Sequence, residues 1–221
     1  MTTSKLTTIQ IETSPNPTAS VIWMHGLGAD GNDFVPIVNE LDLRGCPAIR
    51  FVFPNAPHIP VTVNGGYVMP AWYDIRSADL LNREDEVGLR SSQAAIEELI
   101  KIEQNRGAQK IILAGFSQGC AMTLQTGLRQ STPLAGLLCL SGYLPLAAKT
   151  AEERNPANQN VPIFMAHGRQ DPVVQIQRAE QSRDWLASLG YNIEWHEYAM
   201  QHSVNLEEIA DIGKWFRAVL A

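Results

Sequence analysis

The sequence predicts an α/β protein with a mostly parallel central sheet and helices on both of its faces. Short apolar runs rich in Ile, Leu and Val alternate along the chain with longer stretches of helical periodicity. This alternation is typical of parallel strands joined by helical crossovers. No repeat, low-complexity tract or linker interrupts it. We therefore expect residues 1–221 to form a single domain.

The expected elements follow one another in this order. Residues 6–13 alternate between apolar and polar side chains, which predicts an antiparallel edge strand. Further strands are expected within residues 19–24, 49–54, 110–116, 134–143, 161–168 and 192–199, and helices over residues 32–43, 84–105, 120–130, 175–189 and 206–220. Residues 55–77 and the stretch around Glu152 are expected to be loops, the first of them longer than most connections in compact domains.

Local signals at the ends of these helices agree with the assignment. Gly107 and Gly190 stand where glycine is expected to end a helix. Asn205, with Glu208 three residues later, resembles a capping box at the start of the last helix.

Composition and charge exclude several classes of function. The net charge is −6 and the basic residues form no cluster, which argues against nucleic acid or an anionic membrane as the main partner. The three cysteines are scattered, as in proteins of a reducing compartment. The chain shows no secretory signal pattern and no apolar run of the roughly 20 residues that a membrane span needs. We expect a cytoplasmic protein without a stable membrane anchor.

The segment Gly115-Phe116-Ser117-Gln118-Gly119 lies between an apolar strand pattern and a helical pattern. A Gly-x-Ser-x-Gly sequence in this setting is the nucleophile elbow of serine hydrolases, in which a sharp strand-to-helix turn exposes the central serine. The two glycines leave room for that turn. The alternative is that Ser117 only caps the helix between two glycines that allow close packing. The strand before it and the helix after it favour a nucleophile.

A second glycine motif spans residues 26–31 and satisfies Gly-x-Gly-x-x-Gly, the dinucleotide-binding pattern. That pattern also requires an acidic residue at the end of the next strand, which here ends in Phe-Pro-Asn at Asn55. The motif fits better as the loop that donates one oxyanion-hole N–H, with the second donor following the nucleophile. We predict the backbone amides of Leu27 and Gln118 as these donors, and His25 as a buried histidine that bonds the backbone.

A nucleophilic serine needs a carboxylate and a histidine after it in the chain order of this arrangement. Between Ser117 and the last histidine, Asp171 is the carboxylate that closely follows a strand end. The alternative for Asp171 is a helix N-cap with Pro172 at the first helical position.

Two histidines follow Asp171. His202 lies in the loop after the last predicted strand, whereas His196 lies within that strand. Because ligands bind at the carboxyl ends of such strands, His202 is the predicted base. His167 precedes the acid and is expected to shape the turn before it.

Six separated motifs in order, HGLGADGNDF, PNAPHIPVTVNGGYVMPAWYDI, AGFSQGCAMTL, LSGYLP, HGRQDPVV and MQHSV, resemble the phospholipase/carboxylesterase family of serine hydrolases. This family includes bacterial carboxylesterases and acyl-protein thioesterases. The resemblance implies the triad Ser117, Asp171 and His202, the oxyanion donors Leu27 and Gln118, and an α/β-hydrolase fold without a large cap domain, often as a homodimer. Tyr143 in LSGYLP stands where the thioesterase branch carries a tryptophan.

Together these features predict a serine carboxylesterase that hydrolyses esters of small to medium acyl groups through an acyl-enzyme, with no metal or cofactor. We expect residues 55–77 to wall the acyl-binding groove, with Trp72, Tyr143 and Val173 touching a small-molecule ester substrate. Trp72 and Tyr73 have the alternative of pinning this loop to the core. The alternative functions are an acyl-protein thioesterase or lysophospholipase and, from other classes, a non-catalytic ligand-binding protein or an acyltransferase.

Overall fold

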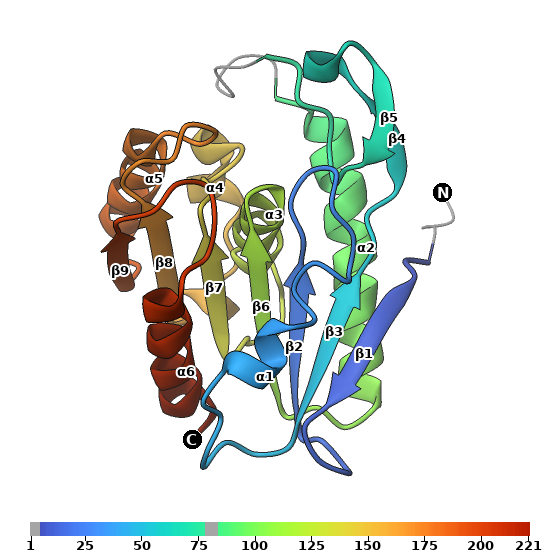
Figure 1. The fold of residues 1–221 in the computed structure, drawn as a ribbon, viewed down its shortest axis with the longest axis vertical. Coiled ribbons are helices and arrows are strands. Elements are labelled where there is room, and N and C mark those ends of the chain that lie inside the picture. The colour runs from blue at the N-terminus through green and yellow to red at the C-terminus, as the bar shows by residue number, and fades with distance from the viewer. Residues whose placement is uncertain (1–4, 78–83) are drawn as a thin grey trace.

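A seven-stranded sheet forms the centre of the computed structural model, which describes residues 5–77 and 84–221 (Figure 1). Its strands lie in the order β1-β3-β2-β6-β7-β8-β9. Edge strand β1 pairs antiparallel with β3, as residues 6–13 predicted, and the other neighbours pair in parallel. The bounds are β1 Thr8–Glu12, β2 Ala19–Met24, β3 Ile49–Pro54, β6 Lys110–Phe116, β7 Gly136–Leu140, β8 Ile163–Gly168 and β9 Ile193–Tyr198.

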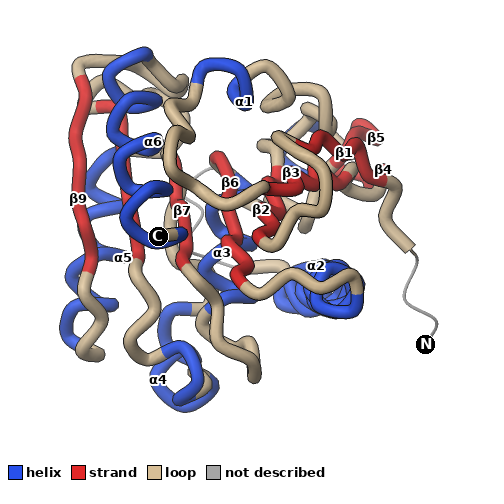
Figure 2. The backbone as a smooth tube through the Cα atoms, turned by 90° about the horizontal axis from the view of Figure 1, so that it is seen from below, coloured by secondary structure: helices blue, strands red, loops and turns tan. Residues whose placement is uncertain are grey.

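Helices cover both faces of this sheet, as predicted (Figure 2). On one face lie α1 (Ile37–Glu40) and α6 (Leu206–Leu220), and on the other α2 (Glu86–Asn105), α3 (Gln118–Gly127), α4 (Ala147–Glu153) and α5 (Ile176–Ser188). Each face buries its own apolar layer, one around Ile96 and Leu124 and one around Trp23 and Phe216. Within the described residues, no helix is long and apolar enough to cross a bilayer.

The order of the strands reverses between β2 and β6, which are direct neighbours in the sheet. From β2 the chain continues to β3 on one side, and from β6 it continues to β7 on the other. The carboxyl ends of the two strands meet, since Met24 is paired with Gly115. Such a switch point leaves a crevice at the carboxyl edge where ligands of open α/β sheets bind.

The predictions for residues 32–43 and for the stretch around Glu152 differ from the structure. Only Ile37–Glu40 is helical within the expected helix over residues 32–43. The Asp30 side chain accepts a hydrogen bond from the Asn32 backbone N–H at 2.8 Å, which stabilises a turn where the helix was expected to begin. The short helix starts later, with Pro36 at its N-cap. Around Glu152, where a loop was expected, the chain forms α4, and Glu153 at its end binds Arg90 and Arg129. These two ion pairs join residues far apart in the sequence.

Residues 55–77 do not form an irregular loop. They contain the strands β4 (His58–Val61) and β5 (Tyr67–Pro70), which pair antiparallel around a 3₁₀ turn at Thr62–Asn64. We call residues 58–70 the hairpin; it stands above the carboxyl edge of the main sheet (Figure 1). Pro60 is the last residue but one of β4, and Pro70 ends β5. In a sequence such prolines argue against strands, but both strands of a two-stranded hairpin are edge strands, where proline is tolerated.

The predicted helix ends agree in part with the structure. Gly107 and Gly190 both follow a helix with positive φ, at 95° and 86°. The Asn205 side chain accepts from the Glu208 backbone N–H at 2.8 Å, as in a capping box. The Glu208 carboxyl group, however, is fully buried and makes no hydrogen bond among the described residues, so the reciprocal half of the box is not formed.

Candidate active site

The segment Gly115–Gly119, which we call the elbow, turns the chain from β6 into α3. Ser117 has φ 56° and ψ −116°, a backbone conformation that L-residues rarely adopt and that only surrounding structure can maintain. A Cβ on Gly115 would collide with the carbonyl of Gly119, and a Cβ on Gly119 would collide with the carbonyl of Met24 in β2. Both glycines are therefore required by close backbone contacts.

Ser117 stands at the N-terminal end of α3 and remains partly exposed. Its backbone N–H donates to Leu140 of β7 at 2.9 Å, and its carbonyl accepts from Ala121 at 3.2 Å. It therefore belongs to the sheet on one side and to the helix on the other. Gly26, the first glycine of the loop after β2, also lies against it, because a Cβ on Gly26 would come within 3.3 Å of the Ser117 Cβ.

Asp171 and His202 come together from two neighbouring strand ends. Nδ1 of His202 lies 2.6 Å from Oδ2 of Asp171, whose side chain is fully buried. The other carboxylate oxygen accepts the backbone N–H groups of Val173 at 2.8 Å and Val174 at 2.9 Å. Helix α5 begins only at Ile176, so Asp171 caps a turn rather than the helix itself. The pair holds the imidazole through Nδ1 and leaves Nε2 for proton transfer.

The ring of His202 packs on Phe116, with ring centroids 4.7 Å apart, and this contact places the imidazole beside the residue that precedes Ser117. His196, the other histidine after Asp171, lies in β9 and bonds to Glu194 at 2.9 Å. His167 shapes the turn as expected, because its Nε2 donates to the Val174 carbonyl at 2.7 Å. Burial lowers the pKa of His167, which keeps it neutral beside Asp171.

The loop after β2 approaches the elbow through its glycines. Gly28 has φ 77°, and its N–H donates to the Pro70 carbonyl of the hairpin at 2.9 Å. His25 is a buried histidine that bonds the backbone, as predicted: Nδ1 donates to the Gly26 carbonyl at 2.7 Å and Nε2 accepts from Ala56 at 3.0 Å. Burial lowers the pKa of His25, so the neutral ring stays in this role. The glycines and His25 of this sequence pattern thus hold the shape of the loop.

Gln118 is fixed by two hydrogen bonds of its side chain. Oε1 accepts from the Trp72 backbone at 3.0 Å, and Nε2 donates to the Tyr73 carbonyl at 2.9 Å. Gln118 is also the first residue of α3, where a backbone N–H has no acceptor within the helix. Such an N–H beside a nucleophile is suited to hold a developing oxyanion. The side-chain role of Gln118 was not visible in the sequence, since its partners lie about 45 residues away.

Ser117 opens into a pocket of about 270 Å³. Apolar side chains dominate its wall, and the lining residues are Leu27, Val63, Asn64, Tyr73, Ile75, Ser117, Gln118, Tyr143, Val173 and Val174. Of the predicted substrate-binding residues, Tyr143 and Val173 line this pocket. Trp72 does not: it is 1% exposed, and its Nε1 donates to the His25 carbonyl at 2.9 Å. Its neighbour Tyr73 lines the pocket instead.

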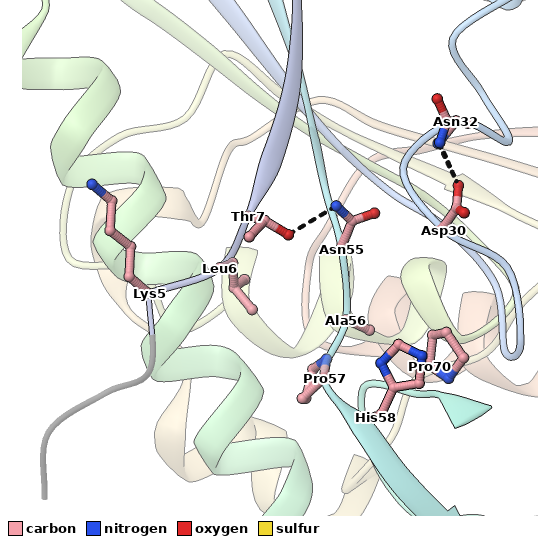
Figure 3. A pocket seen from close by; sticks show the side chains of 10 residues that line it. All are labelled: Lys5, Leu6, Thr7, Asp30, Asn32, Asn55, Ala56, Pro57, His58 and Pro70. Atoms are coloured by element: carbon pink, nitrogen blue, oxygen red, sulfur yellow. Dashed lines mark hydrogen bonds between the residues drawn. The ribbon is translucent and has the colours of Figure 1, made fainter. Parts of the chain in front are cut away.

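A larger hollow, of about 500 Å³, is lined in part by Asp30 and Asn32 of the loop after β2 (Figure 3). Asn55 is its central side chain: Oδ1 accepts from the Gly31 backbone at 2.8 Å, and Nδ2 donates to the Thr7 hydroxyl at 2.9 Å. Its wall mixes polar and apolar side chains and contains none of Ser117, Asp171 and His202. Size therefore does not single out the pocket that Ser117 lines, which is the smaller of the two.

A family profile for phospholipases and carboxylesterases matches residues 7–220. The chain belongs to this family. It is accordingly a serine hydrolase with an α/β-hydrolase fold, and the expectation drawn from its motifs is confirmed.

Named relatives are acyl-protein thioesterases. Acyl-protein thioesterase 1 of Yarrowia lipolytica is 38% identical over 94% of this chain and 94% of its own length. The protein of the same name from Neurospora crassa is 44% identical over 87% of this chain and 83% of its own. The crystal structure of Zea mays acyl-protein thioesterase 2 superposes with a TM-score of 0.86 at 28% identity, covering 97% of this chain and 99% of that one.

Proposed function

We propose that this chain is a thioesterase that removes acyl groups from S-acylated cysteine side chains of proteins, with Ser117 as nucleophile. The relatives named acyl-protein thioesterase, similar over nearly their whole length, support this substrate class. The observation that carries the chemistry is the strained Ser117 at the mouth of a mainly apolar pocket, beside the hydrogen-bonded pair Asp171 and His202.

The proposed mechanism uses the two states of His202. Nε2 takes the proton of the Ser117 hydroxyl while the serine oxygen attacks the thioester carbonyl, and Asp171 stabilises the imidazolium through Nδ1. The backbone N–H groups of Leu27 and Gln118 hold the oxyanion of the tetrahedral intermediate. Collapse of this intermediate expels the thiolate, which takes up the proton from His202, and leaves Ser117 acylated. Water then attacks with His202 again as base, releasing the fatty acid and the free serine.

Hydrolysis of free carboxylic esters is the second candidate function. One observation favours it. Tyr143 lines the pocket, and in the motif LSGYLP it stands where the thioesterase branch of the family carries a tryptophan. An oxygen ester passes through the same acyl-enzyme, so the two functions share every proposed catalytic residue. They differ in the leaving group, which lies outside the acyl pocket.

The test compares Ser117→Ala with Ser188→Ala, a matched control at an exposed serine that ends α5. On a nitrophenyl ester and on an S-acylated peptide, Ser117→Ala should lower kcat/KM at least about a thousandfold, because losing a triad nucleophile removes most of the acceleration. Ser188→Ala should stay within about twofold, as surface substitutions usually do. Comparable activity of the two variants would contradict Ser117 as nucleophile.

The same assay separates the candidate substrates. If the wild-type protein cleaves the nitrophenyl ester but leaves the S-acylated peptide intact, the thioesterase proposal fails and the carboxylesterase remains. If the protein turned over neither substrate and Ser117 were not labelled by a fluorophosphonate, which reacts with an activated serine, a non-catalytic ligand-binding protein would be indicated. Acyl transfer to an added alcohol in preference to water would indicate an acyltransferase.

A further inference from the structure

Two pockets of this protein share one side chain. The Ser117 pocket is lined on one side by Tyr143, and a separate pocket of about 90 Å³ is lined by Tyr143 together with Ala147, Arg178, Ser182 and Trp185. Tyr143 is the residue common to both linings. Tyr143 and its neighbour Leu144 follow β7, whereas the other residues of the second pocket, which we call the side pocket, come from the start of α4 and from α5.

The ring of Tyr143 is held from both directions. Its hydroxyl lies 2.9 Å from the hydroxyl of Tyr73, which also lines the Ser117 pocket. The guanidinium carbon of Arg178, in the side pocket, lies 4.3 Å from the centre of the ring. The backbone that follows is fixed as well, because the Leu144 N–H donates to the Ser182 hydroxyl at 2.9 Å. Only 5% of Tyr143 is exposed, so the ring is packed as a wall rather than a mobile surface group.

We propose that Tyr143 is a partition that ends the acyl pocket and so limits the length of the acyl chain that Ser117 accepts. This inference rests on the proposed function, since it assumes that the Ser117 pocket binds the acyl group. With the ring in place, the chain stops at Tyr143; without the ring, the side pocket becomes a continuation of the acyl pocket. Each further methylene that enters it leaves water, which favours the longer substrate by about fourfold in kcat/KM.

The experiment measures kcat/KM for nitrophenyl esters of increasing acyl length and takes the ratio of the longest to the shortest ester. In Tyr143→Ala this ratio should rise at least about tenfold over the wild type, which corresponds to two buried methylenes. Tyr143→Leu is the second variant: it also removes the ring but keeps an apolar side chain against the core, and the ratio should rise in the same direction. Tyr143→Phe is the matched control, because it loses the hydroxyl bond to Tyr73 and keeps the wall, so its ratio should stay within about twofold of the wild type.

A double variant tests the route of the chain. Ala147 lines the side pocket, and Ala147→Leu in the Tyr143→Ala background should fill that space and return the ratio toward the wild-type value. Thermal unfolding first checks that Tyr143→Ala and Tyr143→Leu are folded. If the wild type cleaves the esters and both folded variants keep the wild-type ratio of longest to shortest ester, the partition is overturned. A gain in ratio that the added leucine does not reverse also overturns it. If the wild type cleaves none of the esters, the proposed function fails and the partition fails with it.

Discussion

The elbow and the hairpin both border the Ser117 pocket, yet they are held in different ways. At Gly115 and Gly119 the elbow is fixed by backbone atoms of α3 and of the end of β2, which leave no space for a Cβ on either glycine. The hairpin carries exposed side chains at Tyr67 and Val68 and reaches the rest of the protein through a few bonds, including that from Gly28 to Pro70. This difference teaches that Ser117, the proposed nucleophile, lies on a segment closely enclosed by backbone, whereas the pocket wall lies partly on a more exposed segment.

Adding one methyl group to each region should expose this contrast most strongly. Gly119→Ala forces α3 away from β2, and we expect the free energy of unfolding to fall by more than about 4 kcal/mol. At Gly65 in the hairpin, an added Cβ meets no atom within 4 Å. Gly65→Ala should therefore lower the free energy of unfolding by about 1 kcal/mol, because alanine is strained at its φ of 67°. Urea denaturation of both variants measures the two losses. Equal losses would show that the elbow is no more constrained than the hairpin.

Outside both regions lies a buried acid, Glu208, in the first turn of α6, the helix that follows His202. Desolvation raises the pKa of Glu208 to about 8. Because this pKa exceeds the value of 4.5 for an exposed glutamate, the folded protein keeps the proton in the window from about 4.5 to 8, and stability falls as the pH rises through it. The loss by pH 9 should be on the order of 4 kcal/mol.

Glu208→Gln should remove most of this dependence, because the amide does not ionise. Urea denaturation at pH 5 and pH 9 gives the two free energies, and their difference should shrink in the variant. Glu207→Gln, an exposed neighbour in the same helical turn, is the control and should keep the wild-type difference. If Glu208→Gln kept the full pH dependence, another group would be responsible.

The smallest expected effect concerns the hairpin. Asp74 accepts from the Thr62 backbone at 2.7 Å and from the Thr62 hydroxyl at 2.6 Å, and so holds the turn that brings Val63 and Asn64 to the pocket. Asp74→Asn should raise KM about two- to fivefold, the equivalent of one modest hydrogen bond, with kcat nearly unchanged.

Steady-state kinetics on one nitrophenyl ester checks this expectation, with Asp184→Asn on the exposed face of α5 as the matched control. A fall in kcat with no change in KM would indicate that Asp74 acts on the chemical step. It would contradict the assignment of the hairpin to the pocket wall alone.

Much of the fold was predictable because its signals are local. The bounds of β2, β3 and β6 agree with their apolar runs, and the elbow was visible as two glycines around a serine between a strand and a helix. The helix expected over residues 32–43 was wrong for all but Ile37–Glu40, since turn bonds of Asp30 compete with the helical pattern. The hairpin was missed because its strands pair only with each other and contain prolines.

The pocket residues illustrate what lies beyond local signals. Trp72 and Tyr73 are adjacent and aromatic, and nothing in their own sequence says which of them faces Ser117. That choice is made by distant partners: the carbonyl of His25 accepts from the Trp72 ring, and the hydroxyl of Tyr143 meets that of Tyr73. The sequence by itself determined the layers, the family and the order of Ser117, Asp171 and His202, because periodicity and backbone chemistry act over a few residues. The tertiary structure decided how large the pocket is and which side chains wall it, because those depend on contacts between segments that only folding brings together.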